Sequence, residues 1–189
     1  MSAGLWLGAL AVLGASVAAV PRYKDGPPPG HTGGFGEPTC RTCHSDAGLN
    51  EPGGELSIRG APATYEPGRT YDLEVVLRRA GMLRAGFQLA ARYQGVGMVP
   101  GGARAGVLAP SDDRTAVVRD SATDVTYIEH TLPGTAVSGG AASWRFRWTA
   151  PTVAGGVVFH VAANAANDDD SPLGDFIYAT AVRVAAMQR

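Results

Sequence analysis

The chain of 189 residues has little charge, and it lacks several features that would point to common classes of protein. Charged side chains make up 17% of it and the formal net charge is −1, so the basic surface that phosphate binding needs is missing. No stretch has a convincing helical period, and no internal repeat is visible. Nothing resembles a catalytic triad, a paired acid–base site or a nucleotide-binding loop. These absences argue against nucleic acid as a partner and against the common classes of enzyme.

Long apolar runs are also missing, except at the start. Residues 1–20 contain no charged side chain, and the apolar run Leu5–Leu13 leads into small residues, which is typical of a secretory signal peptide cleaved after Ala19. A retained membrane anchor is the alternative, but the run is shorter than the roughly 20 residues that span a bilayer. We therefore expect residues 1–19 to be a signal peptide and the protein to be exported, to the periplasm or outside the cell.

Glycine and proline are concentrated in the next segment. Ten of the nineteen residues from Pro21 to Thr39 are Gly or Pro, which excludes a helix or a central strand and predicts a tether over residues 20–39. Residues 40–54 follow as a short separate segment. Residues 55–185 then show a different pattern, and their length suits one domain.

That domain consists of short runs with period-two alternation, broken by turn residues. Trp144, Phe146 and Trp148 alternate with arginines in "SWRFRWTAP", and similar alternation occurs in "TYDLEVVLRR", "GFQLAARY" and "VVFHVAAN". The runs "VTYIEHT", "GVLAP" and "FIYATAVRV" add further strands. Roughly eight strands at this spacing predict an all-β fold, an immunoglobulin-like antiparallel β-sandwich.

Cysteine is scarce, and this scarcity makes its placement informative. The two cysteines, Cys40 and Cys43, are separated by two residues, and His44 follows the second directly. This order is the attachment motif of c-type haem, in which both thiols form thioethers with the porphyrin and the histidine becomes the proximal iron ligand. A zinc site would need more ligands than His31 can add. An exported Cys40–Cys43 disulfide is the other alternative.

The sixth iron ligand is the open question of the haem interpretation. His130 ranks first because it ends a predicted strand beside a turn, from which a side chain can reach a haem docked at the end of the sandwich. Met98 or Met82, both in predicted turns, come next. An open site or His31 is a further alternative, while His160 lies in the middle of a strand and Met187 is near the C-terminus.

Two polar groups invite a functional interpretation as well as an ordinary one. Asp168, Asp169, Asp170 and Asp175, with Asn164 and Asn167 nearby, have the oxygen ligands of a calcium site, but a tight surface turn explains them better because the usual calcium-loop spacing is missing. Four arginines are candidates for haem propionate contacts, although solvent-facing positions are the simpler interpretation: Arg59, Arg78, Arg79 and Arg84.

Several of these motifs together resemble a known family. "GAPATYEPGRTYDLEVVL" and "RAGFQLAAR" are similar to the opening of reeler domains, and "YIEHT", "WRFRWTAP" and "NAANDDDSPLGDFIY" resemble later motifs of their bacterial relatives. The resemblance runs from about Gly36 to Val184 and implies a secreted immunoglobulin-like sandwich preceded by a Cys-x-x-Cys-His element. Cytochrome f is a looser analogy, in which the N-terminal amine is the sixth ligand.

The sequence thus leads to a specific functional hypothesis. It predicts an exported monohaem c-type cytochrome-like protein that transfers single electrons to an unidentified redox partner protein. Association with a membrane or cell-surface complex is left open. The alternative is a haem-free adhesion or carbohydrate-binding module with a Cys40–Cys43 disulfide, in which Tyr65, Tyr93 and Tyr127 are candidate binding residues. The sequence favours an electron carrier over an enzyme.

Overall fold

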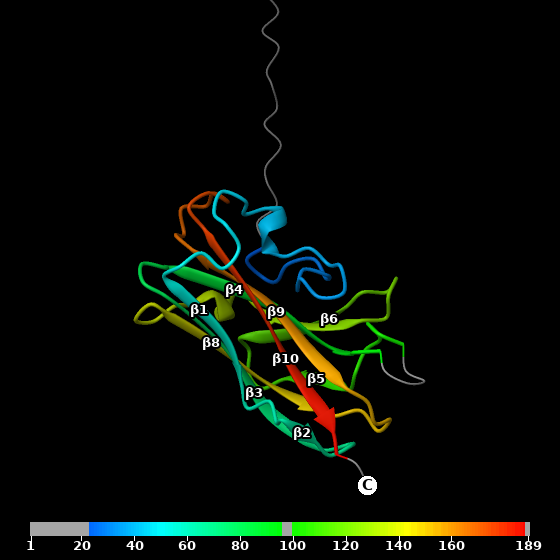
Figure 1. Ribbon diagram of the computed structural model, residues 1–189. Helices are drawn as coiled ribbons and strands as arrows, with labels where there is room; N and C mark the ends of the chain where they lie inside the picture. Colours follow the sequence, from blue (N-terminus) through cyan, green and yellow to red (C-terminus); the bar gives the residue numbers. More distant parts are fainter. Residues whose placement is uncertain (1–22, 96–99, 188–189) are drawn as a thin grey trace, which may run out of the picture.

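A computed structural model describes residues 23–95 and 100–187 of the chain. They form a β-sandwich of two sheets, with short loops at both ends (Figure 1). The predicted signal peptide and Met98 lie outside the described residues. No helix in the described part of the chain has the length and apolar character needed to span a bilayer.

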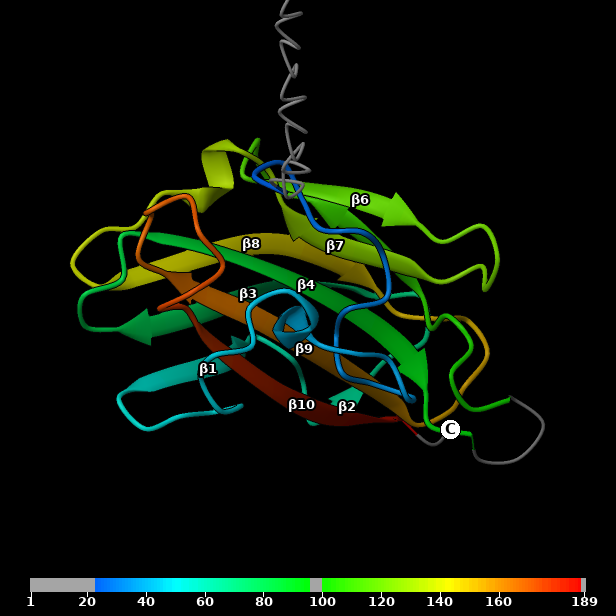
Figure 2. The same ribbon diagram turned by 90° about the horizontal axis from the view of Figure 1, so that it is seen from above.

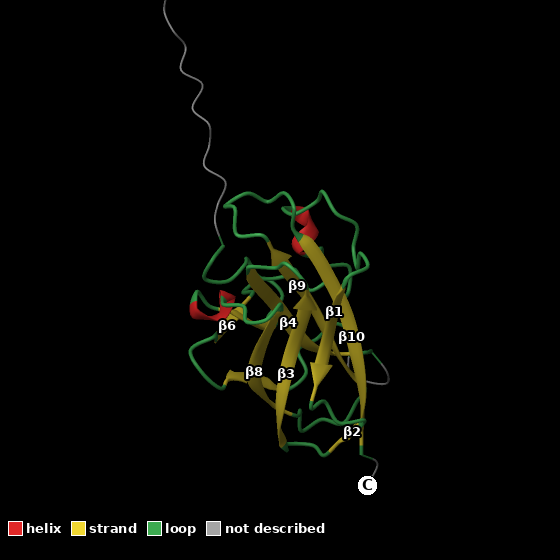
Figure 3. Cartoon of the chain, turned by 90° about the vertical axis from the view of Figure 1, so that its left-hand side faces the viewer, coloured by secondary structure: helices red, strands yellow, loops and turns green. Residues whose placement is uncertain are grey.

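The first sheet has four strands in the spatial order β1-β3-β8-β5, and all its pairs are antiparallel. Figure 3 shows β1, β3 and β8 side by side. In chain order the strands of this sheet are β1 (Gly54–Arg59), β3 (Thr70–Arg79), β5 (Val107–Pro110) and β8 (Ala141–Thr149).

The second sheet has six strands in the order β2-β10-β9-β4-β7-β6, and the short β2 pairs with β10 in parallel. The sheet is therefore mixed rather than purely antiparallel. Two single-turn 3₁₀ helices, η1 (Cys40–Thr42) and η2 (Pro133–Thr135), complete the elements. The strands of the second sheet are β2 (Thr64–Tyr65), β4 (Arg84–Tyr93), β6 (Thr115–Arg119), β7 (Thr126–His130), β9 (Val157–Ala166) and β10 (Phe176–Ala186).

Large apolar side chains fill the space between the sheets. Trp144 and Trp148 on β8 are fully buried, and their indole N–H groups donate to the carbonyls of Gly134 and Ala105. Phe87 stacks on Trp144, and Phe159 meets Trp148 edge to face. These are the inward positions that the alternation predicts, so the all-β sandwich is confirmed. The structure also contains β1, β2 and β6, which none of the predicted strand runs covers.

The six-stranded sheet is buried on its outer face too. On β4, Phe87, Leu89 and Ala91 face the core, yet the outward Gln88, Ala90 and Arg92 are buried as well. The N-terminal segment explains this double burial, since residues 23–44 lie across the outer face of this sheet (Figures 1 and 2). The stretch predicted as a tether is therefore packed against the sandwich in the part that the structure describes.

Candidate functional site

Side chains of β4 and β7 hold the N-terminal segment in place. The Gln88 amide accepts from the His31 backbone N–H at 2.8 Å and donates to the Pro28 carbonyl at 3.1 Å. The Tyr127 hydroxyl donates to Glu37 at 2.6 Å, and Arg92 forms an ion pair with the same carboxylate. These contacts fix the backbone of the segment on both sides of a small turn.

The turn brings His31 and Cys40 into neighbouring positions. Thr32 pairs with Thr39 in an antiparallel bridge, and the Gly33 N–H donates to the Pro38 carbonyl at 2.9 Å. His31 and Cys40 flank the bridged pair on the same side. A histidine nine positions before the motif is therefore held next to its first cysteine.

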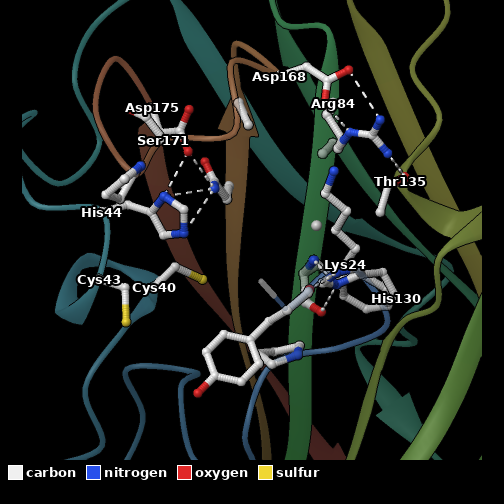
Figure 4. A pocket seen from close by; sticks show the side chains of 18 of the residues that line it. Lys24, Cys40, Cys43, His44, Arg84, His130, Thr135, Asp168, Ser171 and Asp175 are labelled. Carbon is white, nitrogen blue, oxygen red and sulfur yellow. Dashed lines mark hydrogen bonds and ion pairs between the residues drawn. The ribbon is translucent and has the colours of Figure 1, made fainter. Parts of the chain in front are cut away.

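The Cys-x-x-Cys-His motif forms one tight helical turn. Thr39 caps η1 by accepting from the Arg41 N–H, and both the Cys43 and His44 N–H groups donate to the Cys40 carbonyl, at 3.2 and 3.1 Å. Cys40 begins η1 and Cys43 is its C-cap residue, so the two cysteines are one turn apart, with their sulfur atoms pointing in different directions (Figure 4). The motif residues Cys40, Cys43 and His44 all line one cavity.

The cavity has a volume of about 360 Å³, which is within the usual range for small-molecule and cofactor pockets. Figure 4 shows Cys40, Cys43 and His44 on one side of it, and Lys24, Arg84 and His130 on the other. Many of the remaining lining residues are apolar: Tyr23, Pro27, Pro28, Ala85, Phe87, Ala166 and Pro172.

The imidazole of His44 is oriented by a buried carboxylate. His44 Nδ1 lies 2.7 Å from Asp175 Oδ2, and the Asp175 residue is only 1% exposed. The Asn167 backbone N–H and the Asn164 amide donate to Asp175, each at 3.1 Å. An imidazole nitrogen that faces a carboxylate carries the proton, which makes Nδ1 a donor and leaves the lone pair of His44 on Nε2.

Asn164 completes the surroundings of His44. Its amide nitrogen lies 3.3 Å from Nδ1 and 3.5 Å from Nε2, both beyond the ordinary hydrogen-bond range, and its side-chain oxygen is buried without a partner. Asp175 and Asn164, two of the candidate calcium ligands, lie next to His44. A carboxylate behind a histidine is the usual arrangement around a metal-binding imidazole.

His130, the first-ranked sixth ligand, lines the same cavity but is already engaged. Its Nδ1 accepts from the Phe87 N–H at 3.1 Å, and its Nε2 lies 3.3 Å from the Tyr23 carbonyl. Burial lowers its pKa, which favours the neutral ring. The ring fits against β4 because Gly86 has no Cβ, which would otherwise lie 2.6 Å from His130 Cε1.

The other candidate ligands are placed differently. Met82 is buried in the main hydrophobic core, and His160 packs edge to face against Phe35. Neither residue lines the cavity. His31 does line it, with its Nδ1 3.0 Å from the Pro28 carbonyl.

The two thiols are not bonded to each other. Although residue Cys40 is partly exposed, its thiol is desolvated, and this burial raises the pKa of Cys40 to about 12. Redox-active Cys-x-x-Cys pairs need a thiol with a lowered pKa. Cys40 has the opposite property, which argues against a redox-active dithiol.

The acidic loop after β9 forms ion pairs across the cavity. Asp168 binds the Arg84 guanidinium through both carboxylate oxygens, and Asp170 lies 2.8 Å from Lys24 Nζ. Of the four arginines named above, Arg84 lines the cavity. Within residues 23–95 and 100–187, no group of three or more His, Cys, Asp or Glu side chains is arranged to hold a metal ion.

The aromatic residues considered for a binding module are not at the surface. Tyr65, Tyr93 and Tyr127 are all buried. Tyr65 belongs to the main core, and Tyr127 contacts the N-terminal segment. The structure therefore excludes them as exposed binding residues.

Sequence reasoning missed several residues that build the site. Gln88, Tyr23 and Lys24 gave no signal because their roles depend on contacts between distant parts of the chain. The glycine in "RAGFQLAAR" is the one local hint, since glycine within a strand often marks a close approach by another group.

No protein family model matches the chain, and no curated protein does. Among solved structures, a cohesin module of a family 33 glycoside hydrolase from Clostridium perfringens is similar with a TM-score of 0.50 and 9% identity, covering 72% of this chain and 98% of that one. The human F-spondin reeler domain gives a TM-score of 0.49 and 16% identity, covering 75% and 95%. At such identities the likeness concerns the fold alone, a β-sandwich module.

Proposed function

We propose that this protein is an exported c-type cytochrome-like electron carrier with one covalently bound haem. One observation carries the proposal: the three residues Cys40, Cys43 and His44 of the Cys-x-x-Cys-His motif line a single cavity, and the imidazole is already anchored through Nδ1. Haem bound there would supply a centre that takes up and releases one electron.

Cys40 and Cys43 hold the cofactor in this proposal. Addition of each S–H across a vinyl group makes a thioether and releases nothing, so the step needs reduced thiols and no oxidant. Both cysteines are free thiols that emerge from the same helical turn. Attachment after export matches the predicted leader, and we accordingly propose a periplasmic or extracellular location with an unidentified redox partner protein.

His44 is the proximal iron ligand in this proposal, and Asp175 is its positioning residue. With Nδ1 held by the buried carboxylate, Nε2 is the ring nitrogen available to iron. A carboxylate partner raises the basicity of the imidazole and fixes the ring plane. A more basic ligand favours the oxidised iron, so Asp175 helps to set the reduction potential.

The rest of the cavity fits a porphyrin in chemical character. Phe87, Ala85 and Pro28 supply apolar surface. Lys24 and Arg84 are paired with Asp170 and Asp168, and they would bind propionate carboxylates in place of these aspartates. These side chains would limit the access of solvent to a bound iron, which would also tune its potential.

The alternative is a haem-free adhesion or carbohydrate-binding module. The sandwich fold, shared with a cohesin module, is compatible with either function. In that case Cys40 and Cys43 form a disulfide, and the cavity takes a small molecule or remains filled with water.

Expression with a haem c maturation system separates the two. We expect red protein whose haem stays attached through denaturation and is lost in the Cys40→Ala/Cys43→Ala variant. Thr42→Ala is the matched control, because Thr42 lies in the same turn without lining the cavity, and it should stay red. Colourless wild-type protein with an intact-mass value for a Cys40–Cys43 disulfide would establish the alternative.

A further inference from the structure

The second axial position of the iron determines whether small ligands reach it. A histidine suited to this position needs one ring nitrogen with a free lone pair at the cavity and the other nitrogen fixed by an oxygen acceptor. Four histidines occur in the chain, and His31, His44 and His130 line the cavity. Since His44 belongs to the motif, the choice is between His31 and His130.

His130 does not meet the requirement. Its Nδ1 lies 3.1 Å from the Phe87 backbone nitrogen and 3.2 Å from the Phe87 carbonyl oxygen, and its Nε2 lies 3.3 Å from the Tyr23 carbonyl oxygen. Both nitrogens are therefore used by the backbone. Binding iron through either one would leave a buried backbone group without its partner, which is unfavourable.

His31 meets the requirement. Its Nδ1 lies 3.0 Å from the Pro28 carbonyl, and a carbonyl only accepts, so the proton is on Nδ1. The lone pair is then on Nε2, which has no hydrogen-bond partner among the described residues. His44 has the same arrangement, with its Nδ1 donating to Asp175.

The backbone at His31 is also held firmly. Its N–H donates to Gln88, and Gln88 binds the Pro28 carbonyl that fixes the ring. On the other side, Thr32 is buried, and its hydroxyl donates to Glu37. The bridge between Thr32 and Thr39 places His31 beside Cys40, at the edge where the haem would be attached.

From these contacts we infer that His31 is the distal iron ligand and that the haem is bound by two histidines, His31 and His44. This inference rests on the proposed function. It replaces His130, which the sequence ranks first, by a residue that lines the cavity and whose Nε2 has no hydrogen-bond partner among the described residues. His130 then has a structural role, which is to join the Tyr23 carbonyl to β4.

The test uses haem-loaded protein from a maturation-competent host. We expect the wild type to show a six-coordinate low-spin spectrum in both oxidation states, with an electron paramagnetic resonance signal typical of two imidazoles. His31→Ala should keep its covalent haem, lose the low-spin signal and bind carbon monoxide directly when reduced. Added imidazole should restore the low-spin spectrum.

His130→Gln is the matched control, because an amide can replace both backbone contacts, and it should retain the wild-type spectrum. A low-spin His31→Ala protein, a high-spin His130→Gln protein or a five-coordinate wild type would each overturn the inference. All three outcomes require attached haem. Failure of the proposed function can be distinguished from failure of this inference, because in the first case the wild-type protein carries no haem at all.

Discussion

Cys40 and Cys43 differ in their surroundings although they lie in one helical turn. The Cys40 thiol is desolvated, whereas Cys43 is exposed. The thiolate is the reactive form of cysteine, so the two residues should differ in reactivity before any cofactor is attached.

Haem-free protein allows this difference to be measured. With a pKa of about 12, Cys40 is thiolate in only ~1 of 10,000 molecules at pH 8. Iodoacetamide should therefore label Cys43 at least about tenfold faster, as followed by peptide mass spectrometry. The rate at Cys40 should rise with pH up to about 12. Urea-denatured protein is the control, in which both cysteines should react alike; equal rates in the folded protein would contradict the assigned burial.

At the scale of single residues, the motif could be predicted from the sequence, but the residues that contact it could not. Cys40, Cys43 and His44 stand together in the sequence, and chemistry alone gives them a role. Asp175 lies 131 positions after His44, in the loop between β9 and β10, and its carboxylate meets the imidazole because the N-terminal segment packs against this sheet. The sequence presented the same aspartate as one of four acidic residues in a turn.

At the scale of elements, β4 departs most from what its sequence suggests. Alternation in "GFQLAARY" predicted the face made by Phe87, Leu89, Ala91 and Tyr93, and all four residues are buried. It gave no sign that Gln88 and Arg92 would be buried too. A polar side chain at an outward position ordinarily faces water, and only a covering segment with matching polar groups changes that.

The ion pair between Glu37 and Arg92 attaches the N-terminal segment to β4. Its side chains are 14% and 7% exposed, and removal of one partner leaves the other charge poorly solvated. Glu37→Ala should lower the free energy of unfolding by about 3 kcal/mol in urea titrations. Glu66→Ala, which breaks the exposed pair with Arg69, is the control and should change it by less than about 1 kcal/mol. Equal effects would show that the segment adds no stability.

Glu129 on β7 makes the packing of the N-terminal segment against the sheet sensitive to pH. Burial raises its pKa to about 7, opposed by the hydrogen bond from Gln88, with Asp25 nearby adding to the increase. A carboxyl group with a raised pKa binds its proton more tightly in the folded state. Its contribution to stability is therefore complete below its ordinary value of 4.5 and is lost as pH rises through about 7.

We expect urea stability to decrease between pH 5 and pH 8 through this group, and Glu129→Gln to remove that part of the decrease. His130 acts in the opposite direction, because burial lowers its pKa and stability is lost as pH falls below its ordinary value of 6.5. The difference between wild type and Glu129→Gln isolates the carboxyl group. An identical pH profile for both proteins would be the contrary result.

At the scale of the whole molecule, the sandwich was the most predictable property. Period-two runs of large apolar residues specify two sheets facing one core, and Trp144, Phe146 and Trp148 all lie there. The order of strands in each sheet was not predictable, because alternation does not say which strands pair. The parallel pairing of β2 with β10 likewise depends on chain topology rather than on local pattern.

The stability of this core should depend strongly on its tryptophans. Trp144 is fully buried and stacked on Phe87, so Trp144→Ala should lower the free energy of unfolding by about 3–5 kcal/mol. Leu83→Ala is the control, since Leu83 is 66% exposed, and should change it by no more than about 0.5 kcal/mol. Intrinsic fluorescence in guanidinium titrations measures both, and a small loss for Trp144→Ala would mean that the core relaxes to fill the space.

The packed N-terminal segment has a consequence for how electrons would enter and leave. A centre on a free arm would swing between donor and acceptor, as carrier domains do on long linkers. Here Gln88 and Tyr127 on the sheet bind the segment, the latter through Glu37, so the centre would keep one orientation relative to the sandwich. Under the proposed function, an electron donor and an acceptor would then have to dock in turn at the same side of the protein, where the cavity lies.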